Sequence, residues 1–476
     1  MQKFILSLIS GLALSINGQT FMNADLTFTS GIGANAPINH VIEQPDGKLI
    51  VVGEFTSYNN LPFREIVRLN SNGTLDLSFN CGIGLQSSGP YSKIYTACLQ
   101  SDGKILLGGK FNNFNGTVCK NIIRLNSNGS VDNSFNALFN NDVTSIVVQS
   151  NNKIIVLGRF SNLNYTDSCG SIVRLNSNGS IDNSFLTGSG ISTNSASSPL
   201  VSAKIMDADT LIVYGYFNSY NSYSVKHIMK LYPNGLLDTN FVKLGGFNHY
   251  VRNLDFDANK NIYCYGDYNS YKGKPIQPFP KIKRNGILDT TYMMDNYIYG
   301  GTVHSMMINA NGENLFHASI YPNFYISKLL KRDVNGQIDT INCKSGNGFN
   351  SGAVNVLKRL NDGKIIAAGN FLSYRGYPFK NIARIIESNP NSIFEMNERS
   401  SYLKLFPNPA NNEINITTDL DGASIQLYSI VGQLVLESKL NSETKLSLIN
   451  LSSGSYIYKI VKDNNLIKTE KILINK

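Results

Sequence analysis

The sequence predicts an all-β protein in which one repeated unit fills most of the chain and a different, small β domain ends it. Three observations predict this. Only 16% of the 476 residues are charged, whereas 42% are hydrophobic and 40 are glycine. Asn-Gly and Asp-Gly pairs recur between short runs of β-branched and aromatic residues, as is typical of hairpins. Two motifs return about every 53 residues. A coiled coil, a helical bundle and wholesale disorder are excluded by this composition.

The first residues predict a secretory signal peptide over residues 1–18. One lysine precedes the apolar run Phe4–Leu14, and small residues follow near Gly18. The run is too short to span a bilayer, which takes about 20 apolar residues. A buried N-terminal strand or helix is the alternative. Since no later stretch is apolar enough to cross a membrane, we expect an exported protein with no transmembrane segment.

Each repeat carries two motifs that predict four short strands. One reads IVRLNSNGTLDLSF at Ile66–Phe79, and the other, DGKLIVVGEF at Asp46–Phe55, precedes it. The second motif occurs a seventh time as DGKIIAAGNF at Asp362–Phe371. A repeat of this length with four strands is typical of a propeller blade. A β-solenoid is the alternative, although its repeats are usually shorter.

The two ends of the repeated region predict how the array closes. The seventh unit stops at Ile386 without the final Asp-containing strand, and that strand reappears as Asn23–Phe28. A strand from the N-terminus would therefore complete the last blade and leave no exposed sheet edge. The prediction is a seven-bladed β-propeller over residues 19–386.

This region resembles the delta-60 repeat family of predicted β-propellers. The resemblance rests on Gln44–Phe55, Gln100–Phe111, Asp362–Phe371 and the LNSNG copies, and it extends from about Phe21 to Ile386. It implies the propeller fold, and it brings no catalytic residues with it.

A base and an acid flank the glycine of each Asn-Gly pair at fixed distances. The bases are Arg68, Arg124, Arg174, Lys230, Lys281, Lys331 and Arg384, and the acids are Asp76, Asp132, Asp182, Asp238, Asp289, Asp339 and Asp25. A short hairpin would place each base across from its acid as a cross-strand pair. A ring of charges for a ligand is the alternative.

Function is expected where the repeats differ. One variable position lies between the Gly and the Phe or Tyr of the second motif, at Glu54, Lys110, Arg159, Tyr216, Asp267, Ser319 and Asn370. The loops that follow are rich in aromatic residues beside Asn and Ser, which could stack on sugars and bind their hydroxyls. The ligand-binding candidates are Tyr58, Phe114, Tyr220, Tyr271 and Tyr374. The alternative is that these rings clamp neighbouring blades together.

After a linker over residues 387–401, residues 402–476 predict a small β-sandwich of short strands. Its motifs resemble the type A C-terminal sorting domain of the type IX secretion system. They include Pro407, Asn408 and Pro409, then Gly432, Gly454 and Tyr456, and a tail that ends at Lys476. The resemblance implies handling by that machinery in a Bacteroidetes-type bacterium and a secreted or outer-surface location. An ordinary adhesive or carbohydrate-binding sandwich is the alternative.

No motif in the sequence predicts a catalytic residue, a cofactor or a metal ion. The five His show no HxH or HExxH spacing, and a nucleophile elbow and a P-loop are absent. The six Cys are widely spaced, which predicts buried thiols rather than a disulfide framework or a zinc site. The modest net charge of +9 is spread out, so nucleic acid is not an expected partner.

We therefore expect a non-enzymatic binding or adhesion protein whose partner is a polysaccharide or a surface protein. The alternative is a polysaccharide hydrolase or lyase that uses loop acids such as Asp142, Asp167, Asp267 and Asp295. A structural role in a surface layer is the third reading. A cleft holding two or three non-repeat acids around one pocket would favour the enzyme. A shallow face lined by Tyr58, Tyr220, Tyr271 and Tyr374 would favour binding.

Overall fold

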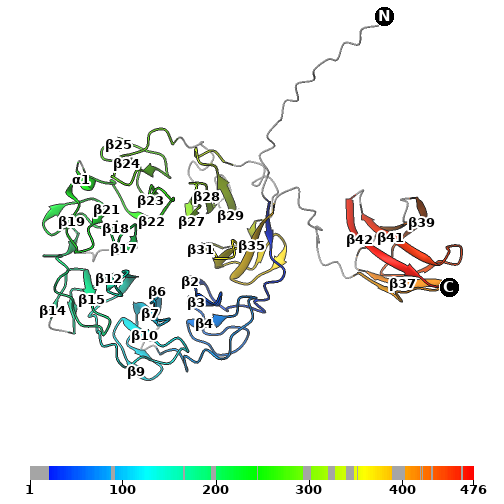
Figure 1. The fold of residues 1–476 in the computed structure, drawn as a ribbon, viewed down its shortest axis with the longest axis horizontal. Coiled ribbons are helices and arrows are strands. Elements are labelled where there is room, and N and C mark those ends of the chain that lie inside the picture. Colours follow the sequence, from blue (N-terminus) through cyan, green and yellow to red (C-terminus); the bar gives the residue numbers. More distant parts are fainter. Residues whose placement is uncertain are drawn as a thin grey trace, which may run out of the picture. The chain divides into compact units, whose positions relative to one another are not determined.

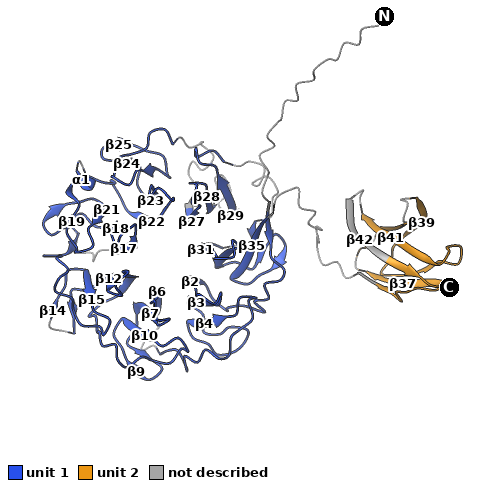
Figure 2. Ribbon diagram, viewed as in Figure 1, with its two compact units in different colours: residues 1–390 blue, residues 391–476 orange. Residues whose placement is uncertain are grey.

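The computed structural model describes residues 21–86, 92–164, 167–193, 200–243, 245–292, 302–319, 327–338, 348–350, 352–388, 403–418, 420, 422–429, 433–462 and 465–476. The chain divides into two compact units, Met1–Pro390 and Asn391–Lys476, which Figure 2 distinguishes by colour. The predicted signal peptide lies outside the described residues. No helix in the described ranges is long and apolar enough to cross a membrane.

Unit 1 contains, in its described part, seven antiparallel sheets that each include three strands of one repeat. The first strands are β2 (Ile38–Glu43), β6 (Lys93–Leu99), β11 (Val143–Val148), β17 (Leu200–Ile205), β22 (Val251–Phe256), β27 (Thr302–Ile308) and β31 (Val354–Arg359). The second strands are β3 (Leu49–Gly53), β7 (Ile105–Lys110), β12 (Ile154–Gly158), β18 (Leu211–Tyr216), β23 (Ile262–Gly266), β28 (Asn314–Ser319) and β32 (Ile365–Gly369). The third strands are β4 (Ile66–Leu69), β10 (Ile122–Leu125), β15 (Ile172–Leu175), β21 (Ile228–Leu231), β26 (Lys281–Ile282), β29 (Ser327–Arg332) and β35 (Ile382–Ser388).

The sheets follow one another around a ring in sequence order, with labelled first strands such as β2, β6 and β22 nearest its centre (Figure 1). The second strand of a sheet is buried on both faces, as in β3, where every residue of Leu49–Gly53 is buried. A tight turn joins the first two strands. There, Gly47 adopts a positive φ of 78°, and Asp46 Oδ1 accepts a hydrogen bond from the Lys48 amide. The Asp-Gly pair of the motif therefore makes this hairpin.

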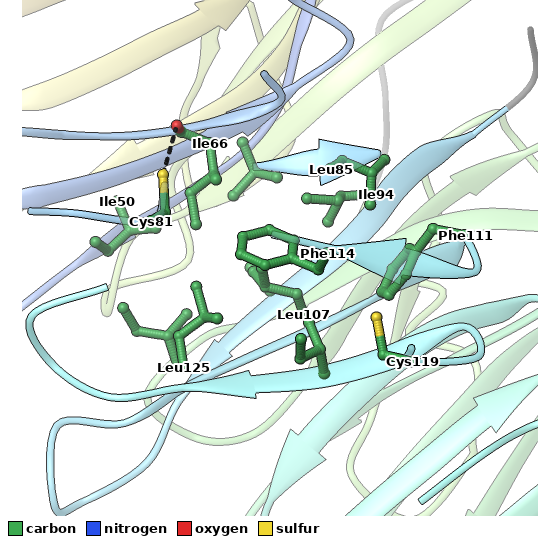
Figure 3. Packing of buried hydrophobic residues seen from close by; sticks show 14 of the residues in the cluster. Ile50, Ile66, Cys81, Leu85, Ile94, Leu107, Phe111, Phe114, Cys119 and Leu125 are labelled. Carbon is green, nitrogen blue, oxygen red and sulfur yellow. Dashed lines mark hydrogen bonds between the residues drawn. The ribbon is translucent and has the colours of Figure 1, made fainter. Parts of the chain in front are cut away.

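Neighbouring sheets share their hydrophobic cores. One core combines Ile50 of β3 with Leu107 of β7 and Leu125 of β10, and Figure 3 shows the Phe114 ring among these side chains. Another core combines Val51 of β3, in the first sheet, with Ile366 of β32, in the last. The first and last sheets of unit 1 therefore pack against each other.

The last sheet has a fourth strand, β1 (Phe21–Ala24), which pairs antiparallel with β35. Its register places Met22 across from Glu387 and Ala24 across from Ile385. The pairing joins the two ends of the repeated region, although β1 begins and ends earlier than the sequence motif suggested.

In the other sheets the expected fourth strand is not a strand. Among the described residues it is reduced to a single bridge, such as Leu69 with Leu75 or Leu125 with Val131. The next residue explains this. Asp76 Oδ1 accepts a hydrogen bond from the Ser78 amide at 3.0 Å, which turns the chain away from the sheet. The acid that recurs in each repeat thus ends the pairing there.

Short strands near the outer loops make small additional sheets. These strands are β5 (Leu85–Gln86), β8 (Asn113–Phe114), β9 (Thr117–Val118), β13 (Asn162–Leu163), β14 (Asp167–Ser168), β16 (Ile191–Ser192), β19 (Ser219–Tyr220), β20 (Tyr223–Ser224), β24 (Ser270–Tyr271), β25 (Lys274–Pro275), β30 (Phe349–Asn350), β33 (Ser373–Tyr374) and β34 (Tyr377–Pro378). One short helix, α1 (Thr239–Val242), begins after Asp238, whose side chain caps it.

Unit 2 consists, where it is described, of two antiparallel sheets around one core. The three-stranded sheet contains β36 (Leu403–Phe406), β37 (Glu413–Thr418) and β40 (Glu443–Ser447). The four-stranded sheet contains β38 (Ser424–Ser429), β39 (Leu434–Lys439), β41 (Gly454–Lys462) and β42 (Asn465–Ile474). Ile416 of β37 and Ile425 of β38 belong to the same buried cluster, so the sheets pack face to face.

Candidate functional site

The five aromatic residues predicted to bind a ligand are core residues. Their side chains are at most 2% exposed: Tyr58, Phe114, Tyr220, Tyr271 and Tyr374. Several also use their hydroxyls inside the fold. The Tyr220 hydroxyl donates to the Gly235 carbonyl at 2.6 Å, and the Tyr374 hydroxyl donates to the Met22 carbonyl of β1 at 2.9 Å. A ligand on the surface cannot stack on these rings, and their packing fits the alternative that they hold the repeats together.

The recurring bases and acids form ion pairs within their sheets. Arg68 Nε donates to Asp76 Oδ2 at 2.7 Å, and the equivalent pair Arg174–Asp182 has 2.8 Å. The further described pairs are Arg124–Asp132, Lys230–Asp238, Lys281–Asp289 and Arg384–Asp25. Asp339 lies outside the described residues.

Each arginine of these pairs also joins its sheet to the next repeat. The Nη1 of Arg68 donates to the Ser127 carbonyl at 2.7 Å, and that of Arg174 donates to the Pro233 carbonyl at 2.6 Å. The Arg68 guanidinium also lies over the Phe79 ring, 4.9 Å from its centroid. The arginines and their acids are buried, and their hydrogen-bonding groups are bound by other parts of unit 1. A structural role therefore accounts for these pairs.

Residues at the variable position of the second motif line a pocket of unit 1. This pocket, about 630 Å³ in volume, is lined by Lys110, Asn141, Asp142, Arg159, Leu200, Tyr216, His249, Tyr250 and Asp267. Four of these residues, Lys110, Arg159, Tyr216 and Asp267, occupy the variable position in four successive repeats. We call this site the mouth pocket. A neighbouring pocket of about 260 Å³ shares Arg159, Leu200 and Tyr250 with it and adds Tyr95 and Thr144.

The remaining lining residues come from the beginning of the first strands. The Arg159 amide donates to the Asp142 carbonyl at 2.8 Å, and the Asp267 amide donates to the Tyr250 carbonyl at 2.9 Å. These backbone hydrogen bonds place Arg159 and Asp267 beside Asp142 and Tyr250, which directly precede the first strands β11 and β22 of the same sheets. Sequence reasoning missed Tyr250 and Leu200, because the first strands carry no recurring motif that would align them.

The two acids of the mouth pocket are paired differently. Arg252 binds Asp267 with two hydrogen bonds, from Nε to Oδ1 at 2.8 Å and from Nη2 to Oδ2 at 3.0 Å. Arg159 approaches Asp142 only to 3.7 Å, between Nη1 and Oδ2, which is an ion pair beyond hydrogen-bonding distance. The site thus holds one firmly bound and one loosely bound carboxylate.

Three ring-bearing side chains, Tyr216, His249 and Tyr250, belong to the pocket lining. The Tyr216 ring lies 5.5 Å from that of His227 and 6.1 Å from that of His249, measured between centroids. His227 is buried, and this burial lowers its pKa to about 4, so it is neutral at pH 7. Tyr216, Tyr250 and His249 therefore present ring surface to the pocket beside the charged groups.

The predicted sorting motifs of unit 2 contact one another. Asn408 Oδ1 accepts a hydrogen bond from the Leu473 amide at 3.0 Å, and the Ala410 amide donates to the Leu473 carbonyl at 2.8 Å. These two hydrogen bonds attach the segment that contains Pro407, Asn408 and Pro409 to the C-terminal tail. The Lys476 amide donates to Ser453 Oγ at 2.9 Å, next to Gly454, where β41 begins. The Tyr456 hydroxyl donates to the Ser452 carbonyl. Gly432 lies outside the described residues.

Metal-ligand chemistry finds no support in the described part of the chain, where no three His, Cys, Asp or Glu side chains come together in a way that could hold an ion. The described cysteines are free thiols: Cys81, Cys98, Cys119, Cys169 and Cys264. Burial raises their pKa values, to about 11 for Cys81 and about 12 for Cys264, so they are unreactive at neutral pH.

Among solved structures, two similar ones are bacterial surface proteins. PorZ, a surface component of the type IX secretion system of Porphyromonas gingivalis, is 10% identical, with a TM-score of 0.43, over 93% of this chain and 60% of its own. The extracellular domain of a putative one-component system from B. thetaiotaomicron is 11% identical, with a TM-score of 0.43, over 96% of this chain and 59% of its own. This chain therefore spans about three fifths of the length of both. A streptogramin B lyase structure is 13% identical, with a TM-score of 0.43, over 78% of this chain and 98% of its own.

A comparison with curated proteins gives no match. Two family models do match. The domain of unknown function (DUF5122) β-propeller matches residues 44–79, 100–135, 149–185, 209–241 and 360–385. The secretion system C-terminal sorting domain matches residues 404–475. The chain therefore carries DUF5122 β-propeller repeats followed by a type IX C-terminal sorting domain, and it is a protein that is secreted or attached to the outer cell surface.

Proposed function

We propose that unit 1 is a seven-bladed β-propeller closed by β1. The pairing of β1 with β35 and the core shared by Val51 and Ile366 support this proposal. A closed ring brings the variable positions of all blades to one mouth, and this convergence is what a binding site in a repeat protein needs.

We propose that the protein is a non-enzymatic binding protein of the cell exterior, and that the mouth pocket is its binding site. One observation carries the proposal: four residues from the variable position of successive repeats line a single pocket. Residues that recur in every repeat, such as Arg68 and Asp76, serve the fold instead. The pocket volume of about 630 Å³ lies within the range of sites that hold small ligands or the end of a polymer.

A polysaccharide is the partner that the lining favours over a surface protein. Tyr216, Tyr250 and His249 offer ring faces on which the apolar face of a sugar can stack. Asn141 and the charged side chains offer partners for hydroxyl groups. A pocket of this size admits a few sugar units, whereas a stable contact with a folded protein usually buries about 800 Å² on each partner.

The test is a glycan panel probed with the full chain, in which retention and the release of reducing ends are both recorded. Binding without release, lost in Tyr216→Ala, is the expected result. Tyr223→Ala is the matched control, because Tyr223 is an exposed tyrosine of β20 that does not line the mouth pocket. Binding that survives Tyr216→Ala but is lost in Tyr223→Ala would place the site elsewhere.

An enzyme that acts on polysaccharides is the second candidate. It is favoured by the presence of Asp142 and Asp267 in one pocket, since two carboxylates are what a glycoside hydrolase needs. The two hydrogen bonds from Arg252 to Asp267 weigh against it, because they occupy one of the two carboxylates that would have to accept or donate protons. Release of reducing ends that stops in both Asp142→Asn and Asp267→Asn would establish the enzyme and overturn the binding proposal.

A further inference from the structure

Arg159 lies where the mouth pocket and the smaller pocket beside it meet. It follows β12 directly, and it lines both the mouth pocket and the smaller pocket beside it. Its side chain is 38% exposed, so part of the guanidinium group faces solvent in the pockets. A ligand that entered either pocket would pass this side chain.

The guanidinium of Arg159 lacks the hydrogen bonds that such a group needs. Its Nε is covered and has no hydrogen-bond partner, and within the described residues its side chain makes no hydrogen bond. The nearest carboxylate, that of Asp142, is 3.7 Å away. Arg252 in the same region is the contrast, because both of its hydrogen bonds to Asp267 are 3.0 Å or shorter.

An arginine with unused donors is a strong site for an anionic group. Two parallel N–H donors match the two oxygens of a carboxylate or a sulfate, and such charge-assisted bonds are stronger than those to a neutral hydroxyl. Because the pocket residue that lacks hydrogen bonds is the positively charged Arg159, the ligand that would bind best carries a negative charge.

The surrounding charges permit an anion despite the two acids. Asp267 is bound by Arg252 with two hydrogen bonds, and Asp142 lies beside Arg159 itself. Lys110 is the second cation of the pocket lining, beside Arg159, whereas Arg252 does not line the pocket. The lining therefore holds two cations and two carboxylates, and Arg252, which lies outside the lining, neutralises Asp267. The paired acids thus do not cancel the attraction for an anionic ligand.

We propose that the mouth pocket binds an acidic oligosaccharide and that Arg159 holds its carboxylate or sulfate group. This inference rests on the proposed binding function and names the ligand class for that site. The rings of Tyr216 and Tyr250 take the sugar face, and Arg159 takes the charged substituent.

The experiment measures the binding of three oligosaccharides of equal length to the full chain by calorimetry. One is neutral, one carries uronate carboxylates and one carries sulfate esters. The acidic probes should bind more tightly than the neutral one, and the tighter of the two identifies the anionic group. Arg159→Gln should weaken acidic binding roughly tenfold or more, since a charge-assisted bond is lost. Arg159→Lys, which keeps the charge without the fork, should weaken it less.

Arg284→Gln is the matched control for charge. It removes one positive charge from an exposed arginine that pairs with Asp207 and does not line the mouth pocket, so acidic binding should not change. Melting curves of all variants confirm that they are folded. Equal affinity of Arg159→Gln and the parent for the acidic probes would overturn the inference.

The remaining outcomes separate this inference from the proposed function. If the neutral probe binds as tightly as the acidic ones and Tyr216→Ala abolishes its binding, the mouth pocket is a binding site but not for anions. If a chain with unchanged melting binds none of the three probes, both proposals fall.

Discussion

Arg384 Nε donates a hydrogen bond to Asp25 Oδ2 at 2.7 Å, across a sequence separation of 359 residues. The side chains of Arg384 and Asp25 are only 6% and 5% exposed. The same arginine donates from Nη1 to the Ser71 carbonyl of the first repeat. One side chain therefore connects the N-terminal strand, the last sheet and the first sheet.

Asp25→Ala should destabilise unit 1 by about 3–5 kcal/mol, because it leaves the buried guanidinium of Arg384 without its anion. Thermal and urea unfolding of the full chain would measure this. Asp207→Ala is the control, since it breaks the exposed pair with Arg284 and should cost about 1 kcal/mol or less. Equal effects of the two substitutions would contradict the special role of the Asp25 pair.

Glu65→Gln should stabilise the protein increasingly as the pH rises from about 4.5 to about 8. Burial raises the pKa of Glu65 from 4.5 to about 8, so the folded state keeps its proton where the unfolded state loses it. The parent therefore loses stability over that window, and the glutamine variant does not. A gain of up to about 3 kcal/mol at pH 8 is expected.

The measurement for Glu65→Gln is the melting temperature over a pH series. Gln can still accept the hydrogen bond that the Ile94 amide donates to Glu65 Oε2. Glu443→Gln, on the exposed surface of unit 2, serves as the control with no pH-dependent difference. A gain that is the same at pH 4 and pH 8 would show that the charge of Glu65 is not its cause.

Tyr220→Phe should lower stability by about 1 kcal/mol and leave ligand binding unchanged. The substitution removes the hydroxyl that donates to the buried Gly235 carbonyl. Tyr223→Phe, three residues along the chain, is the control, because Tyr223 is 54% exposed. Chemical denaturation and the glycan panel would check both effects. Loss of binding in Tyr220→Phe with unchanged stability would restore the loop aromatics as ligand residues.

Asn408→Ala should speed amide exchange at Leu473, because Asn408 Oδ1 accepts the hydrogen bond from that amide. A loss of about 0.5–1.5 kcal/mol of local protection is expected. Asn411→Ala, which replaces an exposed asparagine in the same segment, is the control. Unchanged exchange at Leu473 in Asn408→Ala would show that the motif does not hold the tail.

The sequence predicted what the repeats share. Arg68 and Asp76 could be paired from their positions alone, because the Asn-Gly turn between them fixes the register. The reduction of the expected fourth strand to a single bridge could not be predicted, since it depends on the turn that Asp76 makes with Ser78. β-propensity and motif spacing do not reveal whether a recurring Asp continues the strand pairing or forms a turn through its own side chain.

The candidate site could be predicted only in part. The variable position led to Arg159 and Tyr216, because residues that differ between repeats are not needed by the fold. The loop aromatics were predicted to bind a ligand. They recur three residues after Phe55, Phe111 and Phe217, and a fixed spacing of this kind is typical of residues that pack in the core. Tyr250 could not be predicted as a pocket residue. Its position depends on the hydrogen bond from the Asp267 amide to the Tyr250 carbonyl, and no sequence motif indicates this bond.

The pairing of β1 with β35 also governs when the molecule can finish folding. Hydrogen bonds such as that from the Asp25 amide to the Arg384 carbonyl join segments at opposite ends of the repeats. A ribosome has to complete nearly the whole of unit 1 before they form. Loop-closure entropy opposes such late contacts, and sheets that depend on them form slowly. The first strand to be made, β1, therefore stays unpaired until β35, at the end of unit 1, has been made.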